Sequence, residues 1–228
     1  MTQAKDITFN NYLNRDDFLV KIVRGKKVLH LGCVGSTLSS LETRVDFAKN
    51  SLHYKLSNAA DVIGIDYSED VVTEYKKLGV FDNIKVGNVE KLDQLDLTDK
   101  FDLIIAGDII EHLSNPGLML DGIKKFCNNN TEVVITTPHA FGLANFLRFT
   151  QGKYKDGPDH VMTFNIDNIK NLLQRHGYEI VEINTCFQSL SVKQYSNLFF
   201  TVSKNILEKF PKFGGTLVVL AKLLGEDN

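Results

Sequence analysis

Short apolar runs alternate with amphipathic segments along most of the chain, and this alternation predicts the fold. Five runs rich in Val, Ile and Leu read as buried strands, and residues with apolar positions at helical spacing separate them. Strands that are apolar along their whole length are typical of a parallel sheet covered on both faces. The pattern therefore predicts an α/β protein with a doubly wound sheet. The expected strands are Lys26–Leu31, Asp61–Asp66, Ile84–Val86, Phe101–Ala106 and Thr131–Pro138.

The first expected strand ends in the turn Gly32-Cys33-Val34-Gly35, around which the rest of the chain is organised. Glycine has no Cβ, so the backbone can take positive φ and a ligand can approach the main chain closely. A dinucleotide fingerprint needs glycine where this chain has Val34 and Thr37, which disfavours a nicotinamide oxidoreductase. The second strand ends in Asp66, whose carboxylate can accept hydrogen bonds from both hydroxyls of a ribose. This order indicates a nucleotide-like ligand.

Other segments are expected to flank or complete the sheet. Residues 1–25 are expected to form an N-terminal helical cap, because Asn14 can cap a helix with apolar residues at helical spacing. A helix over Phe47–Ala60 is expected to carry His53 on its solvated side. Residues 140–165 contain a run of phenylalanines after the fifth strand, and we expect a lid insertion there. The last expected elements are a helix over Ile166–Arg175, a strand over Tyr178–Phe187, a helix over Tyr195–Phe210 and a strand over Gly215–Ala221.

Length and composition narrow the class of protein. A chain of 228 residues with 43% hydrophobic content suits one α/β domain, so we expect a single domain over residues 1–228. The formal net charge of −2 and the dispersed basic residues give no support for nucleic-acid binding. There is no signal-peptide pattern and no apolar run of the ~18 residues that span a bilayer, so we expect a soluble, cytoplasmic protein. Cys33, Cys127 and Cys186 form no CxxC pair, which argues against disulfides or structural zinc.

From Lys26 onward, the ordered landmarks resemble those of class I S-adenosylmethionine-dependent methyltransferases. They are Val28-Leu29-His30-Leu31-Gly32-Cys33-Val34-Gly35, Gly64-Ile65-Asp66, Gly87-Asn88-Val89-Glu90, Phe101-Asp102-Leu103-Ile104-Ile105 with Glu111-His112-Leu113, and Thr136-Thr137-Pro138. The resemblance implies a Rossmann-like sheet of seven strands, mostly parallel, with helices on both faces. One antiparallel strand, near Thr216–Leu223, would lie beside the sixth strand.

The resemblance also implies that S-adenosylmethionine is the cofactor, and it implies a binding site at the carboxyl edge of the sheet. Matching positions are Gly32, Cys33 and Gly35 for the methionine part, Asp66 for the ribose with Tyr67 beside it, Asn88 and the main chain of Val89 for the adenine, and Gly107 and Asp108 near the sulfonium.

Two residues depart from the family pattern. His30 stands where an acidic residue is usual before the first glycine, and Val34 replaces the middle glycine of the turn. A methyltransferase-like protein that binds the cofactor without catalysis therefore stays an alternative.

Transfer of a methyl group to an oxygen additionally needs a group that accepts the hydroxyl proton. Asp108, His112 and His160 are the expected catalytic residues, with His139 as a further candidate at the same edge. Several phrases of the chain resemble methyltransferases of small molecules, sugars or lipids, so an acceptor of that kind is the expected partner. No metal is expected. The set Asp108, Glu111, His112 and His160 nevertheless resembles the metal ligands of small-RNA 2′-O-methyltransferases and of some catechol-type quinone-precursor methyltransferases, which keeps a divalent metal as an open alternative.

Overall fold

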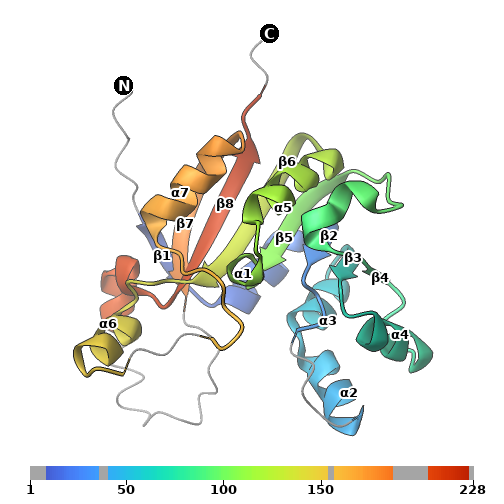
Figure 1. Ribbon diagram of the computed structural model, residues 1–228, viewed down its shortest axis with the longest axis horizontal. Coiled ribbons are helices and arrows are strands. Elements are labelled where there is room, and N and C mark those ends of the chain that lie inside the picture. The colour runs from blue at the N-terminus through green and yellow to red at the C-terminus, as the bar shows by residue number, and fades with distance from the viewer. Residues whose placement is uncertain (1–8, 36–40, 154–156, 187–204, 226–228) are drawn as a thin grey trace.

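One mixed β-sheet organises the molecule. A computed structural model describes residues 9–35, 41–153, 157–186 and 205–225. The strands are β1 (Phe9–Leu13), β2 (Lys27–Leu31), β3 (Asp61–Asp66), β4 (Ile84–Val86), β5 (Phe101–Gly107), β6 (Cys127–Pro138), β7 (Tyr178–Cys186) and β8 (Thr216–Leu223). Their order in the sheet is β1-β7-β8-β6-β5-β2-β3-β4 (Figure 1). Strand β8 runs antiparallel to both of its neighbours, and the other pairings are parallel. The mostly parallel sheet with one inserted antiparallel strand is thereby confirmed.

Helices cover both faces of this sheet. They are α1 (Arg15–Val23), α2 (Leu41–Asn50), α3 (Leu52–Ser57), α4 (Glu69–Lys77), α5 (Pro116–Ile123), α6 (Leu143–Thr150) and α7 (Ile166–Arg175). Buried side chains of α5 and α7 join one core cluster with residues of the central strands. Buried side chains of α1 and α3 form a second cluster with other residues of the strands. Buried side chains of α2 and α4 form a third cluster beside β4.

The helix beginnings agree with the sequence signals. Asn14 caps α1, because its side-chain oxygen accepts a hydrogen bond from the backbone N–H of Asp17 at 3.2 Å. The next expected helix is instead two helices. Ser51 interrupts it, since its hydroxyl accepts a hydrogen bond from the N–H of Tyr54 at 3.2 Å and starts α3. The expectation that His53 faces solvent is wrong, because its side chain is fully buried.

Strand β1 corrects the expectation of seven strands. The expected N-terminal helical cap contains α1, but residues 9–13 form an eighth strand that pairs in parallel with β7. Of the helix expected over Tyr195–Phe210, residues 205–209 are helical, and residues 195–204 lie outside the described residues. Within the described residues, no helix is long and apolar enough to cross a membrane.

The topology places several loops at one edge. The carboxyl ends of the parallel strands meet there, and the direction of winding reverses between the neighbouring strands β2 and β5. Such a switch point leaves a crevice in which open α/β sheets bind ligands. The glycine turn follows β2 and Asp108 follows β5, so both lie at this switch point. Helix α6 lies within the expected lid insertion, residues 140–165.

Candidate active site

The glycine turn has the conformation that its residue types allow. Gly32 and Gly35 both have φ of +72°, a region that side chains with a Cβ rarely adopt. The N–H of Gly32 donates to the carbonyl of Ile65 at 2.9 Å, which ties the turn to β3. Val34, which lies between them, does not have a positive φ, and its side chain is buried in the cluster beside β4. The middle position therefore needs no glycine here.

Asp66 holds the turn from the end of β3. One carboxylate oxygen accepts a hydrogen bond from the N–H of Val34 at 2.9 Å, and the other accepts one from the N–H of Ser68 at 3.1 Å. The residue is 6% exposed. A carboxylate has about four acceptor positions, so two remain for a ligand. Tyr67, the next residue, is 78% exposed at this edge.

The other expected cofactor residues offer mainly backbone to a ligand. The side chain of Cys33 is buried beside Gly64, and burial raises the pKa of its thiol well above the usual value. Asn88 caps a short 3-10 helix, with its side-chain oxygen accepting from the N–H of Glu90 at 2.8 Å. The side chain of Val89 is buried in the core.

His30 forms a buried pair with His53. The two Nδ1 atoms lie 3.1 Å apart, and the rings stack with centroids 5.4 Å apart. Burial, followed by the neighbouring His53, lowers the pKa of His30 well below its usual value. Burial likewise lowers the pKa of His53 to about 4. Two neutral imidazoles therefore stand where the resemblance implies a negative charge.

Asp108 is held by side chains from two other elements. Its φ is +48°, an uncommon conformation for a residue with a side chain. One carboxylate oxygen pairs with the guanidinium of Arg15 on α1, and the other accepts a hydrogen bond from the hydroxyl of Thr136 at 2.8 Å. These contacts fix the position of the carboxylate that was expected to act in catalysis. Arg15 is a site residue that sequence reasoning missed, because only the packing of α1 brings it to β5.

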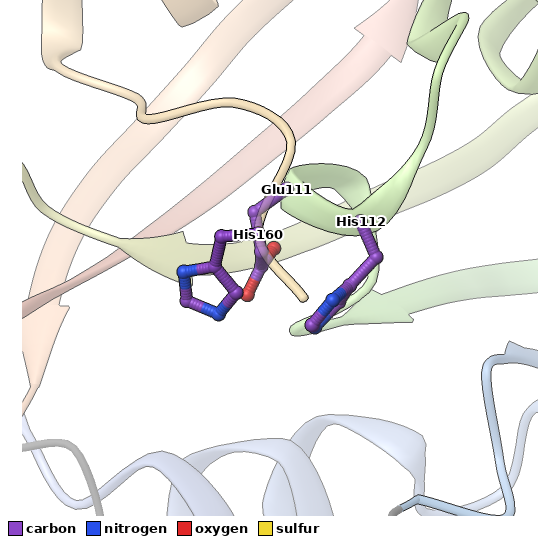
Figure 2. Close-up of side chains that lie close together, drawn as sticks. All are labelled: Glu111, His112 and His160. Atoms are coloured by element: carbon purple, nitrogen blue, oxygen red, sulfur yellow. The ribbon is translucent and has the colours of Figure 1, made fainter. Parts of the chain in front are cut away.

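Glu111, His112 and His160 form a cluster at the same edge (Figure 2). One ligand atom from each side chain can be chosen so that all lie within 4.8 Å of one another. The carbonyl of Glu111 accepts hydrogen bonds from the N–H groups of Val161 and Met162 at 2.8 and 3.1 Å, which fixes the segment that carries His160. Three of the four residues considered for a metal are thus brought together, and Asp108 is not part of the group.

Burial sets the electrostatics of this cluster. It raises the pKa of Glu111 to about 7, with the nearby charge of Asp108 as the second cause. The hydroxyl of Thr137 donates a hydrogen bond to one carboxylate oxygen of Glu111 at 3.0 Å. His112 Nδ1 lies 3.1 Å from the carbonyl oxygen of Asp159, a contact in which this nitrogen is the donor. Glu111 can therefore accept a proton near neutral pH, and the three side chains together can hold a divalent cation.

Sequence reasoning placed Glu111 only in the metal alternative and did not predict a buried carboxyl with a raised pKa. The signal was available, since Glu111 directly follows the apolar pair Ile109-Ile110. His139, the further candidate, is buried and is not part of this group, and its Nδ1 lies 3.1 Å from the carbonyl oxygen of Gly214. A cavity of about 860 Å³ lies between α5 and α7, and no expected cofactor residue lines it.

Comparison with known proteins identifies relatives of this chain. A family model described as a methyltransferase domain matches residues 12–183, more than half of the chain. A mitochondrial ubiquinone biosynthesis O-methyltransferase of Schizosaccharomyces pombe is 24% identical over 193 residues, covering 77% of this chain and 66% of the relative. A ubiquinone biosynthesis O-methyltransferase of Azorhizobium caulinodans is 23% identical and covers 59% and 48%, respectively. The chain thus spans less than two thirds of either relative.

Solved structures share the fold at low sequence identity. A SAM-dependent methyltransferase from Archaeoglobus fulgidus has a TM-score of 0.58 and 18% identity, with 91% of each chain covered. A magnesium protoporphyrin IX methyltransferase from Synechocystis, solved with bound SAH, has a TM-score of 0.57 and 16% identity, with 91% of this chain and 81% of that chain covered. These structures confirm the fold, and the matching family model confirms the resemblance read from the sequence. The chain belongs to the methyltransferase-domain family.

Proposed function

We propose that this chain transfers a methyl group from S-adenosylmethionine to an oxygen of a small-molecule, sugar or lipid-linked acceptor. The observation that carries the proposal is Glu111, a buried carboxyl with a pKa of about 7 at the edge where the glycine turn and Asp66 lie. The names of the two curated relatives support oxygen as the methylated atom. A cytoplasmic location stays a prediction.

The residues present fit S-adenosylmethionine. The glycine turn offers a close main-chain approach, and Asp66 has acceptor positions left for a ribose. Arg15 supplies a cation at the same edge, beside Asp108. Its Nε donates to Asp16 at 3.1 Å and one terminal nitrogen pairs with Asp108, so only the remaining N–H donors of the guanidinium could serve the carboxylate of the methionine part. The failed nicotinamide spacing at Val34 agrees with this choice.

When bound, S-adenosylmethionine supplies an electrophilic methyl group on a sulfonium. The protein would hold the acceptor oxygen in line with that methyl group. Glu111 would accept the hydroxyl proton, since its pKa is close to neutral, and His112 and His160 would orient the acceptor by hydrogen bonds. Residues 140–165 would cover the acceptor and select it.

The direct test is methyl transfer by a Glu111→Gln variant to a panel of probes that contains 3,4-dihydroxybenzoate, glucose and a phenol. We expect kcat to fall by ~100-fold or more, within the range for loss of a general base. In the wild type, kcat should rise about tenfold per pH unit below pH 7 and level off above it, because the carboxylate must be ionised.

Glu179→Gln is the matched control, since Glu179 is an exposed glutamate on β7. Calorimetry with S-adenosylhomocysteine should give the same affinity for both variants and the wild type. Cofactor binding without transfer to any probe would favour the non-catalytic alternative. Equal activity of the two variants would remove Glu111 from the mechanism.

The geometry of the cluster also supports a second candidate role, in which Glu111, His112 and His160 bind a divalent cation. We expect full activity in EDTA, because Asp108, the fourth residue considered, is paired with the guanidinium of Arg15 and is not part of the group. Loss of activity in EDTA with recovery in Mg²⁺ or Mn²⁺ would assign the cluster to a cation instead.

A further inference from the structure

Two segments far apart in the chain expose large apolar side chains near one another. We call this group the aromatic surface. Its members are Phe141 (67% exposed), Phe146 (57%), Leu147 (44%) and Phe149 (67%) from one segment, and Ile206 (41%), Phe210 (46%) and Phe213 (37%) from the other. Soluble monomers rarely expose contiguous apolar patches, and such patches usually mark an interaction site.

Backbone contacts bring the two segments together. A Cβ on Gly142, the residue before α6, would lie 2.9 Å from the Cα of Gly215 and 3.0 Å from the carbonyl oxygen of Gly214. The short 3-10 helix Pro211–Phe213 ends directly before Gly214. In Figure 1, α6 in yellow accordingly lies beside the red segment that precedes β8.

Helix α6 has no buried residue, although its eight residues include two phenylalanines and two leucines. Short isolated helices are marginal in water, and helices in proteins gain their stability from packing an apolar face. In the described part of the chain, Leu143 of α6 is partly buried, whereas Phe146, Leu147 and Phe149 stay exposed. Among the described residues, the phenylalanines of α6 thus offer an exposed face to a partner that accepts aromatic and aliphatic side chains.

The charge of these segments points to the chemistry of that partner. Residues 141–153 and 205–213 contain four basic residues, Arg148, Lys153, Lys209 and Lys212, against one acidic residue, Glu208. The whole chain carries a net charge of −2, so this surface is locally basic in an acidic protein. The Nζ atoms of Lys209 and Lys212 lie 5.9 and 5.2 Å from the ring centroids of Phe210 and Phe213. Phenylalanines interleaved with cations suit the headgroup region of an anionic bilayer.

We propose that the aromatic surface docks the protein peripherally on anionic lipid bilayers. The phenylalanines of α6 enter the boundary between headgroups and acyl chains, while the lysines next to Phe210 and Phe213 contact lipid phosphates. A second copy of the chain is a poorer occupant, because two surfaces of the same positive charge would face each other. The proposal does not depend on the methyl-transfer reaction.

The test is sedimentation of the full chain with vesicles of phosphatidylcholine that contain 30% phosphatidylglycerol, about one lipid in three, at low and high salt. We expect binding that weakens at least about tenfold in Phe146→Ser/Phe149→Ser, in Lys209→Gln/Lys212→Gln, in pure phosphatidylcholine and in high salt. Thermal unfolding and S-adenosylhomocysteine affinity should stay as in the wild type, which shows that both variants fold.

The matched control is Leu78→Gln/Leu118→Gln, which removes two exposed leucines that lie outside the aromatic surface. It should bind vesicles like the wild type. The proposal is overturned if the wild type does not bind anionic vesicles, or if control and surface variants lose binding equally. It is also overturned if the wild type dimerises without vesicles and Phe146→Ser/Phe149→Ser makes it monomeric while vesicle binding is unchanged.

Discussion

At the scale of single residues, the buried histidines have a defined proton arrangement. The side-chain nitrogen of Asn83 donates to the hydroxyl of Ser57 and the carbonyl of Val62, so its oxygen is left as an acceptor. His53 therefore donates from Nε2 to Asn83, at 3.3 Å, and its Nδ1 accepts from Nδ1–H of His30. A proton added to this acceptor nitrogen would break the chain of hydrogen bonds.

This arrangement predicts acid sensitivity. The folded pKa of His53 is about 4 and the unfolded value is near 6.5, so the unfolded state binds protons first as the pH falls. The contribution to the free energy of unfolding is full above pH 6.5 and is lost between pH 6.5 and 4, by about 1.4 kcal/mol per pH unit. Denaturant titrations should show a shallower decline for His53→Gln than for the wild type. Lys77→Gln, at an exposed lysine of α4, should follow the wild type, and parallel curves for all three proteins would refute the prediction.

Asp66 carries a second prediction at this scale. Asp66→Ala should weaken S-adenosylhomocysteine binding by ~1–3 kcal/mol, because a charge-assisted hydrogen bond to the ribose and the tie to Val34 are both lost. Calorimetry measures the change. Asp61→Ala, at the opposite end of β3, should bind like the wild type. Unchanged affinity of a folded Asp66→Ala protein would exclude this residue from the site.

At the scale of elements, the turn after β2 is constrained from two sides. Besides its positive φ, Gly32 has no room for a Cβ, which would lie 2.7 Å from Cδ1 of Ile109. The obstacle is thus a side chain of the loop after β5, whereas the sequence had suggested the cofactor alone. The turn and this loop support each other.

Gly32→Ala should therefore lower the melting temperature and weaken S-adenosylhomocysteine binding. Gly79→Ala is the matched control, because Gly79 has φ of +64° and open space around it. The stability lost in this variant measures the backbone strain alone, which is ~1–2 kcal/mol. Adding Ile109→Ala to Gly32→Ala should recover part of the stability. If Gly32→Ala costs no more than Gly79→Ala, the contact with Ile109 has no energetic weight.

Elements differ in how far the sequence could predict them. The bounds of β3 and α7 were predicted in full, because an apolar run and a capped amphipathic pattern are local signals. Strand β1 was missed, since Phe9–Leu13 contains two asparagines and gains its pairing only from β7, far along the chain. The same reason decides which site residues could be predicted. Residues at strand ends were predictable, whereas the pairing of Arg15 with Asp108 depends on tertiary packing.

At the scale of the whole molecule, the expected lid and the cofactor site belong to different parts of the sheet edge. Replacing residues 143–153 by a short Gly-Ser linker should leave S-adenosylhomocysteine affinity within about threefold, because β2 and β3 hold the glycine turn and Asp66. Methyl transfer to any probe that the wild type accepts should fall at least about tenfold, since these residues would select the acceptor. Undiminished transfer, or loss of cofactor affinity, would contradict the lid.

The position of β8 has a consequence for the order of folding. This strand comes last among those described, yet it separates β6 from β7, and β7 carries β1. During synthesis, β7 and β1 have no access to the central sheet until Thr216–Leu223 leaves the ribosome, and a two-stranded ribbon alone is marginally stable. The backbone N–H of His139 donates to the carbonyl of Gly215 at 2.8 Å, so this hydrogen bond also forms only after that part of the chain has been synthesised. We therefore expect the acceptor side of the edge to mature only after translation of the last strand, while the half around β2 and β3 can assemble on the nascent chain.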